Sequence, residues 1–168
     1  MASFDLSATD HDHSRRKFIT GSLRAVWASA VVAASAPGPA FAAEKSREIV
    51  QPESLDREGF MQRAFEMRQI AQQRGDQAYG AVIVKDGKIV GEGISSVLVR
   101  PDPTAHGEVE AIRDAARRLG TNDLSGCEIY STAKPCPMCE TACYWARISR
   151  IFYGRAITDG GSPRYPSC

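Results

Sequence analysis

One histidine and two cysteines stand at spacings that suit a metal ion. His106 is followed thirty residues later by Cys136, and Cys139 lies one helical turn further on, in the segment Pro135–Cys139. Imidazole and thiolate groups are ligands that zinc prefers, and a catalytic zinc has three protein ligands and an open position for water. We therefore expect His106, Cys136 and Cys139 to hold one zinc ion.

A carboxylate stands close enough to the expected metal ion to move protons. Glu108 lies two residues after the histidine and can serve a metal-bound water without binding the metal. Zinc lowers the pKa of such a water to near neutrality. One carboxylate can then accept a proton from the water and later deliver one to a departing group. The alternative for Glu108 is a solvated acid in the first turn of a helix, where acids are common.

Two further cysteines leave open a structural zinc site with four protein ligands. Cys143 lies four residues after Cys139, on the same helical face, and Cys127 is a second candidate. A buried cysteine more often acts as a small apolar side chain, so we expect an open site. Cys168 is expected to lie at a free or processed end of the chain and not to be a ligand.

The remaining pattern predicts the elements that position these residues. We expect helices over residues 56–74, 105–119 and 138–146, and strands over residues 79–85, 88–94, 127–131 and 150–153. Asp86-Gly87 between the first two strands is a hairpin signal. The tail from Asp159 to Pro166 is expected to be irregular. This order of helices and strands predicts an α/β domain with layers around a central sheet.

The spacing of apolar residues predicts which face of each of the first two helices is buried. In the first helix the expected face comprises Phe60, Ala64, Met67 and Ala71. In the second helix it comprises Val109, Ile112, Ala116 and Leu119.

The first 42 residues predict an export signal. Arg15-Arg16 begin a twin-arginine pattern, Val26–Ala36 is a short apolar stretch, and Ala40–Ala42 is an A-x-A cleavage signal. The apolar stretch is shorter than the roughly 20 residues that span a bilayer. We expect a periplasmic or secreted protein, not held at the membrane after cleavage, with a polar lead-in over 43–55, a folded domain over 56–159 and an irregular tail over 160–168. The alternative is a disordered basic tail.

Composition and charge restrict the classes of partner. The chain has 168 residues, of which 43% are hydrophobic and 24% are charged, as is typical of one globular domain. Removing the four basic and three acidic residues of the expected signal from totals of 21 and 20 leaves 17 of each sign. A net charge of zero gives no general attraction for a polyanion. We therefore expect no nucleic-acid partner.

The stretch from about Tyr79 to Asp159 resembles the cytidine-deaminase-like superfamily, specifically its guanine and nucleobase deaminase branch. The motifs that carry the resemblance are Asp102–Arg113, Leu124–Tyr130, Pro135–Cys139 and Tyr144–Ile148. H-x-E together with P-C-x-x-C is the signature of zinc-dependent nucleobase deaminases. The resemblance implies a three-layer α/β/α fold with a mixed sheet of about five strands. It also implies one zinc ion per subunit and a homodimer with active sites near the interface.

The resemblance also implies roles for single residues. The family's zinc ligands match His106, Cys136 and Cys139, and its proton shuttle matches Glu108. Asp159 matches an acid that helps to hold the purine, although an aspartate before two glycines is also typical of a turn. The implied reaction is hydrolytic deamination, in which zinc-bound hydroxide attacks the amine-bearing carbon of a small heterocycle and ammonia leaves. Guanine, converted to xanthine, is the expected substrate.

Three departures from the branch keep other substrates open. Gly107 stands where this branch more often has alanine, and glycine occurs there in fungal-type cytosine deaminases. Ser96 stands where an asparagine usually binds the base, and a hydroxyl cannot offer the paired contact of an amide. The chain ends nine residues after Asp159, where guanine deaminases have a longer segment. The alternatives are a cytosine or nucleoside deaminase and a non-catalytic module stabilised by zinc.

Overall fold

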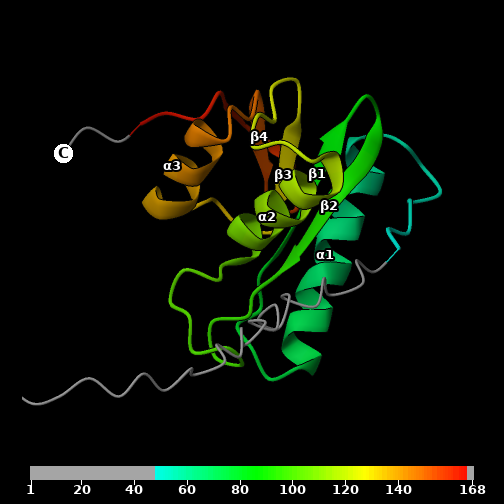
Figure 1. Cartoon of the computed structure of the whole chain (residues 1–168). Helices are drawn as coiled ribbons and strands as arrows, with labels where there is room; N and C mark the ends of the chain where they lie inside the picture. The colour runs from blue at the N-terminus through cyan, green and yellow to red at the C-terminus, as the bar shows by residue number, and fades with distance from the viewer. Residues whose placement is uncertain (1–47, 166–168) are drawn as a thin grey trace, which may run out of the picture. The chain divides into compact units, whose positions relative to one another are not determined.

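The computed structural model describes residues 48–165, which form three helices and five strands (Figure 1). The expected export signal lies outside the described residues. The elements in chain order are α1 (Arg57–Gln73), β1 (Gly80–Lys85), β2 (Lys88–Ile94), α2 (Gly107–Leu119), β3 (Glu128–Ser131), α3 (Pro137–Trp145), β4 (Arg150–Tyr153) and β5 (Thr158–Gly161). Within residues 48–165, no helix has the length and apolar character needed to cross a membrane.

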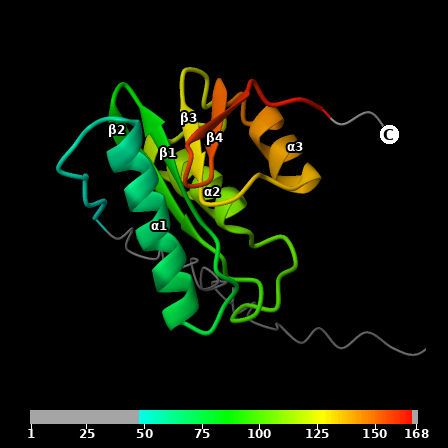
Figure 2. The same ribbon diagram turned by 180° about the vertical axis from the view of Figure 1, so that it is seen from behind.

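The strands form one mixed sheet in the order β2-β1-β3-β4-β5. Strands β3 and β4 are parallel, and the other neighbouring pairs are antiparallel. Helix α1 covers one face of the sheet, and α2 and α3 cover the other (Figures 1 and 2). The expected three-layer α/β/α fold with a five-stranded mixed sheet is therefore confirmed.

Alternate residues of the central strands supply two separate cores. Ile83 and Ile129 point toward α2 and α3, where they pack with Ala111, Ala115 and Cys143. The residues next to them in the strands, such as Val82 and Tyr130, pack against α1 on the opposite face. This alternation follows from the two-residue period of a β-strand, and it makes both faces of β1 apolar.

Helix α1 begins and ends with standard capping contacts. The side chain of Asp56 accepts a hydrogen bond from the backbone N–H of Gly59 at 2.8 Å. At the other end Gly75 has a φ of 78°, and the N–H groups of Gly75 and Asp76 donate to the carbonyls of Gln72 and Ala71. This pair of bonds is a Schellman motif. The face predicted for α1 is buried, as expected.

The residues that α2 buries most deeply are not the predicted ones, although Ile112 of the predicted face is partly buried against the core. The buried residues of the helix are small or polar, and they are Gly107, Glu108, Ala111, Asp114 and Ala115. A Cβ atom at Gly93 of β2 would lie 2.0 Å from the carbonyl oxygen of Gly107. The backbones of α2 and β2 are therefore in direct contact, and only small residues fit between them. Bulkier apolar side chains lie at the flanks, and Leu119 is 37% exposed.

The tail predicted to be irregular contains the fifth strand. Residues Thr158–Gly161 pair antiparallel with β4, with Thr158 opposite Tyr153 and Asp159 opposite Phe152. Asp and Gly have low β-propensity, so the pattern gives no strand signal here. The free edge of β4 supplies the hydrogen-bonding groups that hold this segment extended.

The other edge of the sheet is formed by β2. The β1–β2 hairpin turns at Asp86 and Gly87, whose φ values of 50° and 72° fit the predicted two-residue turn. Outside β2, the side-chain amide of Gln51 donates to the carbonyl of Ile89 at 2.8 Å and accepts from its N–H at 2.9 Å. A single side chain therefore satisfies both backbone groups of Ile89 at this edge.

Candidate metal and catalytic site

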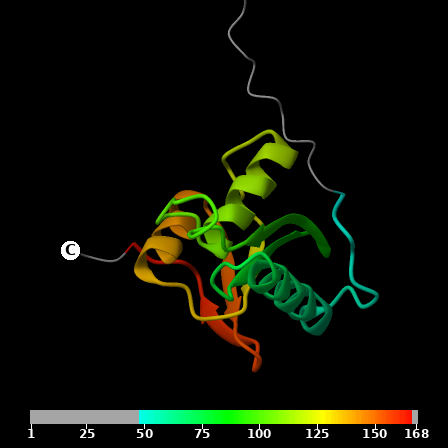
Figure 3. The ribbon, with the colours of Figure 1, turned by 90° about the horizontal axis from the view of Figure 1, so that it is seen from below.

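The strand directions bring the predicted site residues to one end of the sheet. Strands β2 and β3 both run antiparallel to β1, so the segments that follow them leave the sheet at the same end. The segment after β2 leads to His106, the N-cap of α2, and the segment after β3 leads to Cys136, the N-cap of α3. Viewed from below, the starts of these helices lie beside the loop after β2 (Figure 3).

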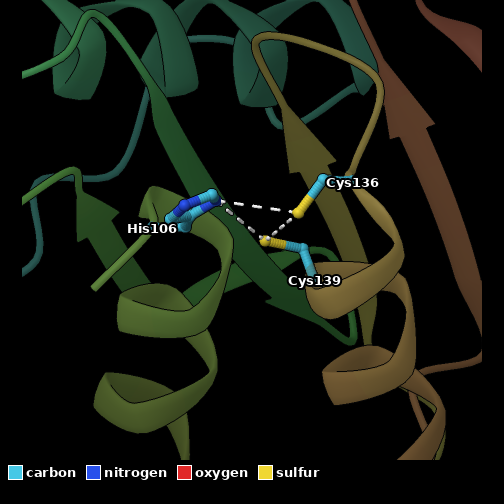
Figure 4. A group of neighbouring side chains, drawn as sticks. All are labelled: His106, Cys136 and Cys139. Carbon is cyan, nitrogen blue, oxygen red and sulfur yellow. Dashed lines mark hydrogen bonds between the residues drawn. The ribbon is translucent and has the colours of Figure 1, made fainter. Parts of the chain in front are cut away.

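The three predicted ligands point toward one another (Figure 4). His106 Nδ1 lies 3.8 Å from Cys136 Sγ and 3.5 Å from Cys139 Sγ, and the two sulfurs are 3.6 Å apart. Tetrahedral zinc with ordinary bond lengths places two sulfurs about 3.8 Å apart, and a sulfur and a nitrogen about 3.6 Å apart. The side chains thus already stand close to the spacing that one zinc ion requires.

The cluster has three members among residues 48–165, and neither additional cysteine joins it. Cys127 and Cys143 are fully buried in the apolar core between the sheet and helices α2 and α3. Burial raises the pKa of the Cys143 thiol to about 12, so this group is a neutral apolar neighbour. The geometry therefore favours an open metal site over a closed structural one.

Glu108 is buried beside the cluster, in contrast to a solvated acid of a helical first turn. It is 5% exposed. Its Oε1 accepts a hydrogen bond from Ser131 Oγ at 3.0 Å, and its Oε2 lies 3.5 Å from the Cys139 sulfur, which donates to it. One oxygen is therefore held by the end of β3, while the other faces the predicted metal ligands.

The electrostatics of the cluster favour a cation. Burial, and then the negative charge of Glu108, raise the pKa of the Cys139 thiol far above its ordinary value. The positive ends of two helix dipoles point at the cluster, but they do not offset this desolvation. A bound divalent ion stabilises the thiolate directly, so this set of donor groups fits zinc.

The structure places Ser96 next to the segment that carries His106 and leaves Asp159 apart. Ser96 is buried, and its N–H donates to the carbonyl of Ala105, the residue before His106, at 2.9 Å. Asp159 is exposed on β5, where its Oδ1 pairs with Arg150 Nε at 3.0 Å. In the described part of the chain, no contact joins Asp159 to the metal cluster. The substrate-binding role of both residues stays a prediction.

A cavity of about 300 Å³ lies where α1 and the start of β1 meet the segment after β3. Its lining includes Tyr79 and Thr132, and Thr132 directly follows the serine that binds Glu108. Gly107 packs against the same wall, because a Cβ there would lie 3.1 Å from the Cα of Gly80 and 3.2 Å from the carbonyl carbon of Tyr79. Gly107, which stands where alanine is more common in this branch, thus lies where the start of α2 meets the start of β1.

Two residues near the site were not predicted from the sequence. Ser131 is the last residue of β3, and only the packing of α2 against the sheet shows that it reaches Glu108. Asp76 follows the last turn of α1 and binds the loop after β2, as described below. A polar residue at the end of a mostly apolar strand segment was the available signal for Ser131.

The chain is thus an α/β protein with a zinc-type site. This site has three ligands, an open position and a buried glutamate beside it. Residues 55–155 match the family described as the cytidine and deoxycytidylate deaminase zinc-binding region, and the chain belongs to this family.

Curated relatives include the guanine deaminase of Bacillus subtilis, 52% identical over 81 residues. They also include the tRNA-specific adenosine deaminase of Aquifex aeolicus, 40% identical over 99 residues. The matches cover 48% and 59% of this chain, and 52% and 66% of the respective relatives. The chain thus spans between half and two thirds of the length of these relatives.

The crystal structure of the B. subtilis guanine deaminase superposes with a TM-score of 0.57 at 45% identity, covering 59% of this chain and 64% of that one.

Proposed function

We propose that the chain is a zinc-dependent hydrolytic deaminase of a purine-type nucleobase or a related aminated heterocycle, with guanine as the first substrate. One observation carries the proposal: a buried glutamate lies beside three metal ligands that leave a coordination position open. A non-catalytic zinc module has no need of an acid that is 5% exposed and has one oxygen facing the cluster.

Each residue of the site has a part in this reaction. His106, Cys136 and Cys139 would hold the ion, which supplies an activated water when bound. Glu108 would take a proton from that water and deliver protons to a ring nitrogen and then to the departing amine. The hydrogen bond from Ser131 fixes one carboxylate oxygen, so the other stays directed at the reacting atoms.

The relatives support two classes of substrate. The 52% identity with a guanine deaminase favours a free purine base. The matches to five tRNA-specific adenosine deaminases are less identical, at 35–40%, but they extend over 95–107 residues. The balanced charge of residues 43–168 favours the small molecule, because binding to RNA relies on a basic surface. A tRNA adenosine is the second candidate.

The test is ammonia release by the zinc-loaded chain. The panel contains guanine, cytosine, adenine, their nucleosides and an anticodon stem-loop with adenosine at its first position. We expect release from guanine and none from the stem-loop. Release from the stem-loop alone would replace our proposal with RNA editing, and release from cytosine alone would assign the fungal-type activity that Gly107 suggests.

A matched pair of variants separates enzyme from binding module. Glu108→Gln keeps the size of the side chain and removes the proton carrier, so we expect one zinc ion per chain and a rate at least about a hundredfold lower. Glu110→Gln, two residues along the same helix, changes a carboxylate that pairs with Arg100 and Arg113. It should leave the rate within about twofold. Equal rates for both variants would contradict the role of Glu108.

We further propose that residues 1–42 direct export by the twin-arginine route and that residues 56–159 form the deaminase domain. We also propose that the mature chain is a periplasmic homodimer. Export after folding would let zinc occupy Cys136 and Cys139 before they meet an oxidising compartment. Mass spectrometry of the secreted chain should give Ala43 as the first residue, and light scattering should give twice the mass of the mature chain. An uncleaved cytoplasmic monomer would contradict these proposals.

A further inference from the structure

The loop between β2 and α2 is held by a carboxylate that takes no direct part in the proposed reaction. Asp76 is 8% exposed, and its two oxygens accept five hydrogen bonds. Four of the donors belong to this loop: Ser95 Oγ at 2.7 Å, Val97 N at 3.2 Å, Leu98 N at 2.7 Å and Val99 N at 3.0 Å. The fifth donor is the N–H of Gln77 at 2.8 Å.

Asp76 is itself held in place by the end of α1. Its N–H donates to the carbonyl of Ala71 at 3.0 Å, as the second bond of the Schellman motif around Gly75. This position usually carries an apolar side chain that packs on the helix. Here it carries a buried charge instead. The carboxylate therefore extends from a fixed helix end into a loop without regular secondary structure.

The other side of this loop is bound to the segment that carries His106. The N–H of Ser96 donates to the carbonyl of Ala105 at 2.9 Å, and Ala105 is fully buried. The loop is thus fixed between Asp76 and the residue before the predicted metal ligand. It projects beyond the end of the sheet at which α2 and α3 begin (Figures 1 and 2).

The hydrogen bonds to Asp76 favour its ionised form. Burial alone would raise the pKa of its carboxyl group, but the hydrogen bonds from Val99, Ser95, Gln77 and Leu98 outweigh burial and lower the pKa to about 2. At the same time the loop exposes two large apolar side chains, with Leu98 61% and Val99 49% exposed. Exposed apolar groups on a fixed backbone are suited to contact a ligand.

We propose that Asp76 is a positioning residue for the substrate, which fixes loop 95–99 as one wall of the deaminase site. By ordering the loop before the substrate arrives, it removes an entropy cost from binding. Asp76 does not touch the reacting atoms, so its effect falls on substrate affinity and not on the chemical step. This inference rests on the proposed function, since it concerns the substrate of that same site.

The test compares Asp76→Asn with Asp114→Asn in the full-length, zinc-loaded chain. Asp114 is a matched control, because it is 6% exposed and accepts hydrogen bonds from Glu92 N, Arg117 and Arg118 without touching loop 95–99. We expect Asp76→Asn to raise KM about tenfold or more, with kcat within about threefold and zinc retained. Asp114→Asn should lower Tm and leave KM unchanged.

Amide hydrogen exchange gives a readout that does not depend on turnover. The N–H groups of residues 97–99 should be protected in the wild-type chain and exchange quickly in Asp76→Asn. Should that variant fail to fold, Ser95→Ala removes one of the five hydrogen bonds and should raise KM by a smaller factor. An equal rise of KM in both aspartate variants, or unchanged exchange in Asp76→Asn, would overturn the proposal. An inactive wild-type chain with protected amides would instead count against the proposed function alone.

Discussion

The direct contact between β2 and α2 makes Gly93→Ala a sharp test of how the site is positioned. The new Cβ would lie 2.0 Å from Gly107 O and 2.2 Å from Ala111 N. A carbon–oxygen contact needs about 3.3 Å, so α2 must retreat by roughly 1.3 Å. Both atoms that it meets belong to the helix backbone, so no side-chain rotation relieves the clash.

The expected cost has a structural and a functional part. Overpacking of this kind costs about 3 kcal/mol, and the lower chain entropy of alanine in the unfolded state returns up to about 1 kcal/mol. The free energy of unfolding should therefore fall by about 2 kcal/mol. His106 starts the displaced helix, and a misplacement of about 1 Å can lower a catalytic rate a hundredfold.

Urea unfolding, metal content and kcat together measure these effects. Gly160→Ala on exposed β5 is the control, because its nearest new contact is the ring of Tyr153 at 3.1 Å, which can rotate. It should change stability by no more than about 0.5 kcal/mol. A Gly93→Ala chain with wild-type stability, zinc content and kcat would refute the conclusion that the α2–β2 contact positions His106.

Three other perturbations test the surroundings of the site. Ser131→Ala removes the hydrogen-bond donor to Glu108, so it should lower kcat about tenfold or more with zinc retained. Steady-state kinetics and metal analysis measure both effects. An unchanged kcat would mean that the Glu108 carboxylate does not need this hydrogen bond. Cys143→Ala should keep one zinc ion per chain and lower the free energy of unfolding by about 1–2 kcal/mol. Cys136→Ala should lose the metal. Loss of zinc in Cys143→Ala would indicate a closed site. The folded-state pKa of Asp76 is lowered to about 2 from an ordinary value near 3.9. Its stabilising contribution is therefore complete above about pH 4 and is lost as pH falls toward 2. Acid titration followed by circular dichroism should show a shallower loss of stability across this window in Asp76→Asn, and identical titration curves would contradict the lowered pKa.

The metal cluster could be predicted from the sequence because its chemistry restricts both residue type and spacing. Few kinds of site other than a zinc site need an imidazole with a carboxylate two residues later and, further along the chain, two thiols that are one helical turn apart. The prediction needed no knowledge of the sheet, since each ligand lies at the N-cap or in the first turn of a helix that its own local pattern marks.

The surroundings of the cluster depend on contacts between distant segments, which local patterns do not contain. Asp76 and Ser95 are 19 residues apart and meet only because the β1–β2 hairpin returns the chain to the end of α1. The error in the α2 face has a similar origin. Periodicity favours the largest apolar side chains, but the glycines of β2 leave room only for Ala111 and Ala115.

The Gln51 side chain has a consequence for how the protein associates with other chains. An exposed edge strand can recruit a strand from a neighbouring molecule and so begin aggregation. At Ile89, in the first half of β2, the amide of Gln51 occupies both of the backbone groups to which such a strand would bind. A foreign strand would first have to displace this amide. Gln51 thus protects the exposed edge from strand addition at that point and adds no further strand of its own.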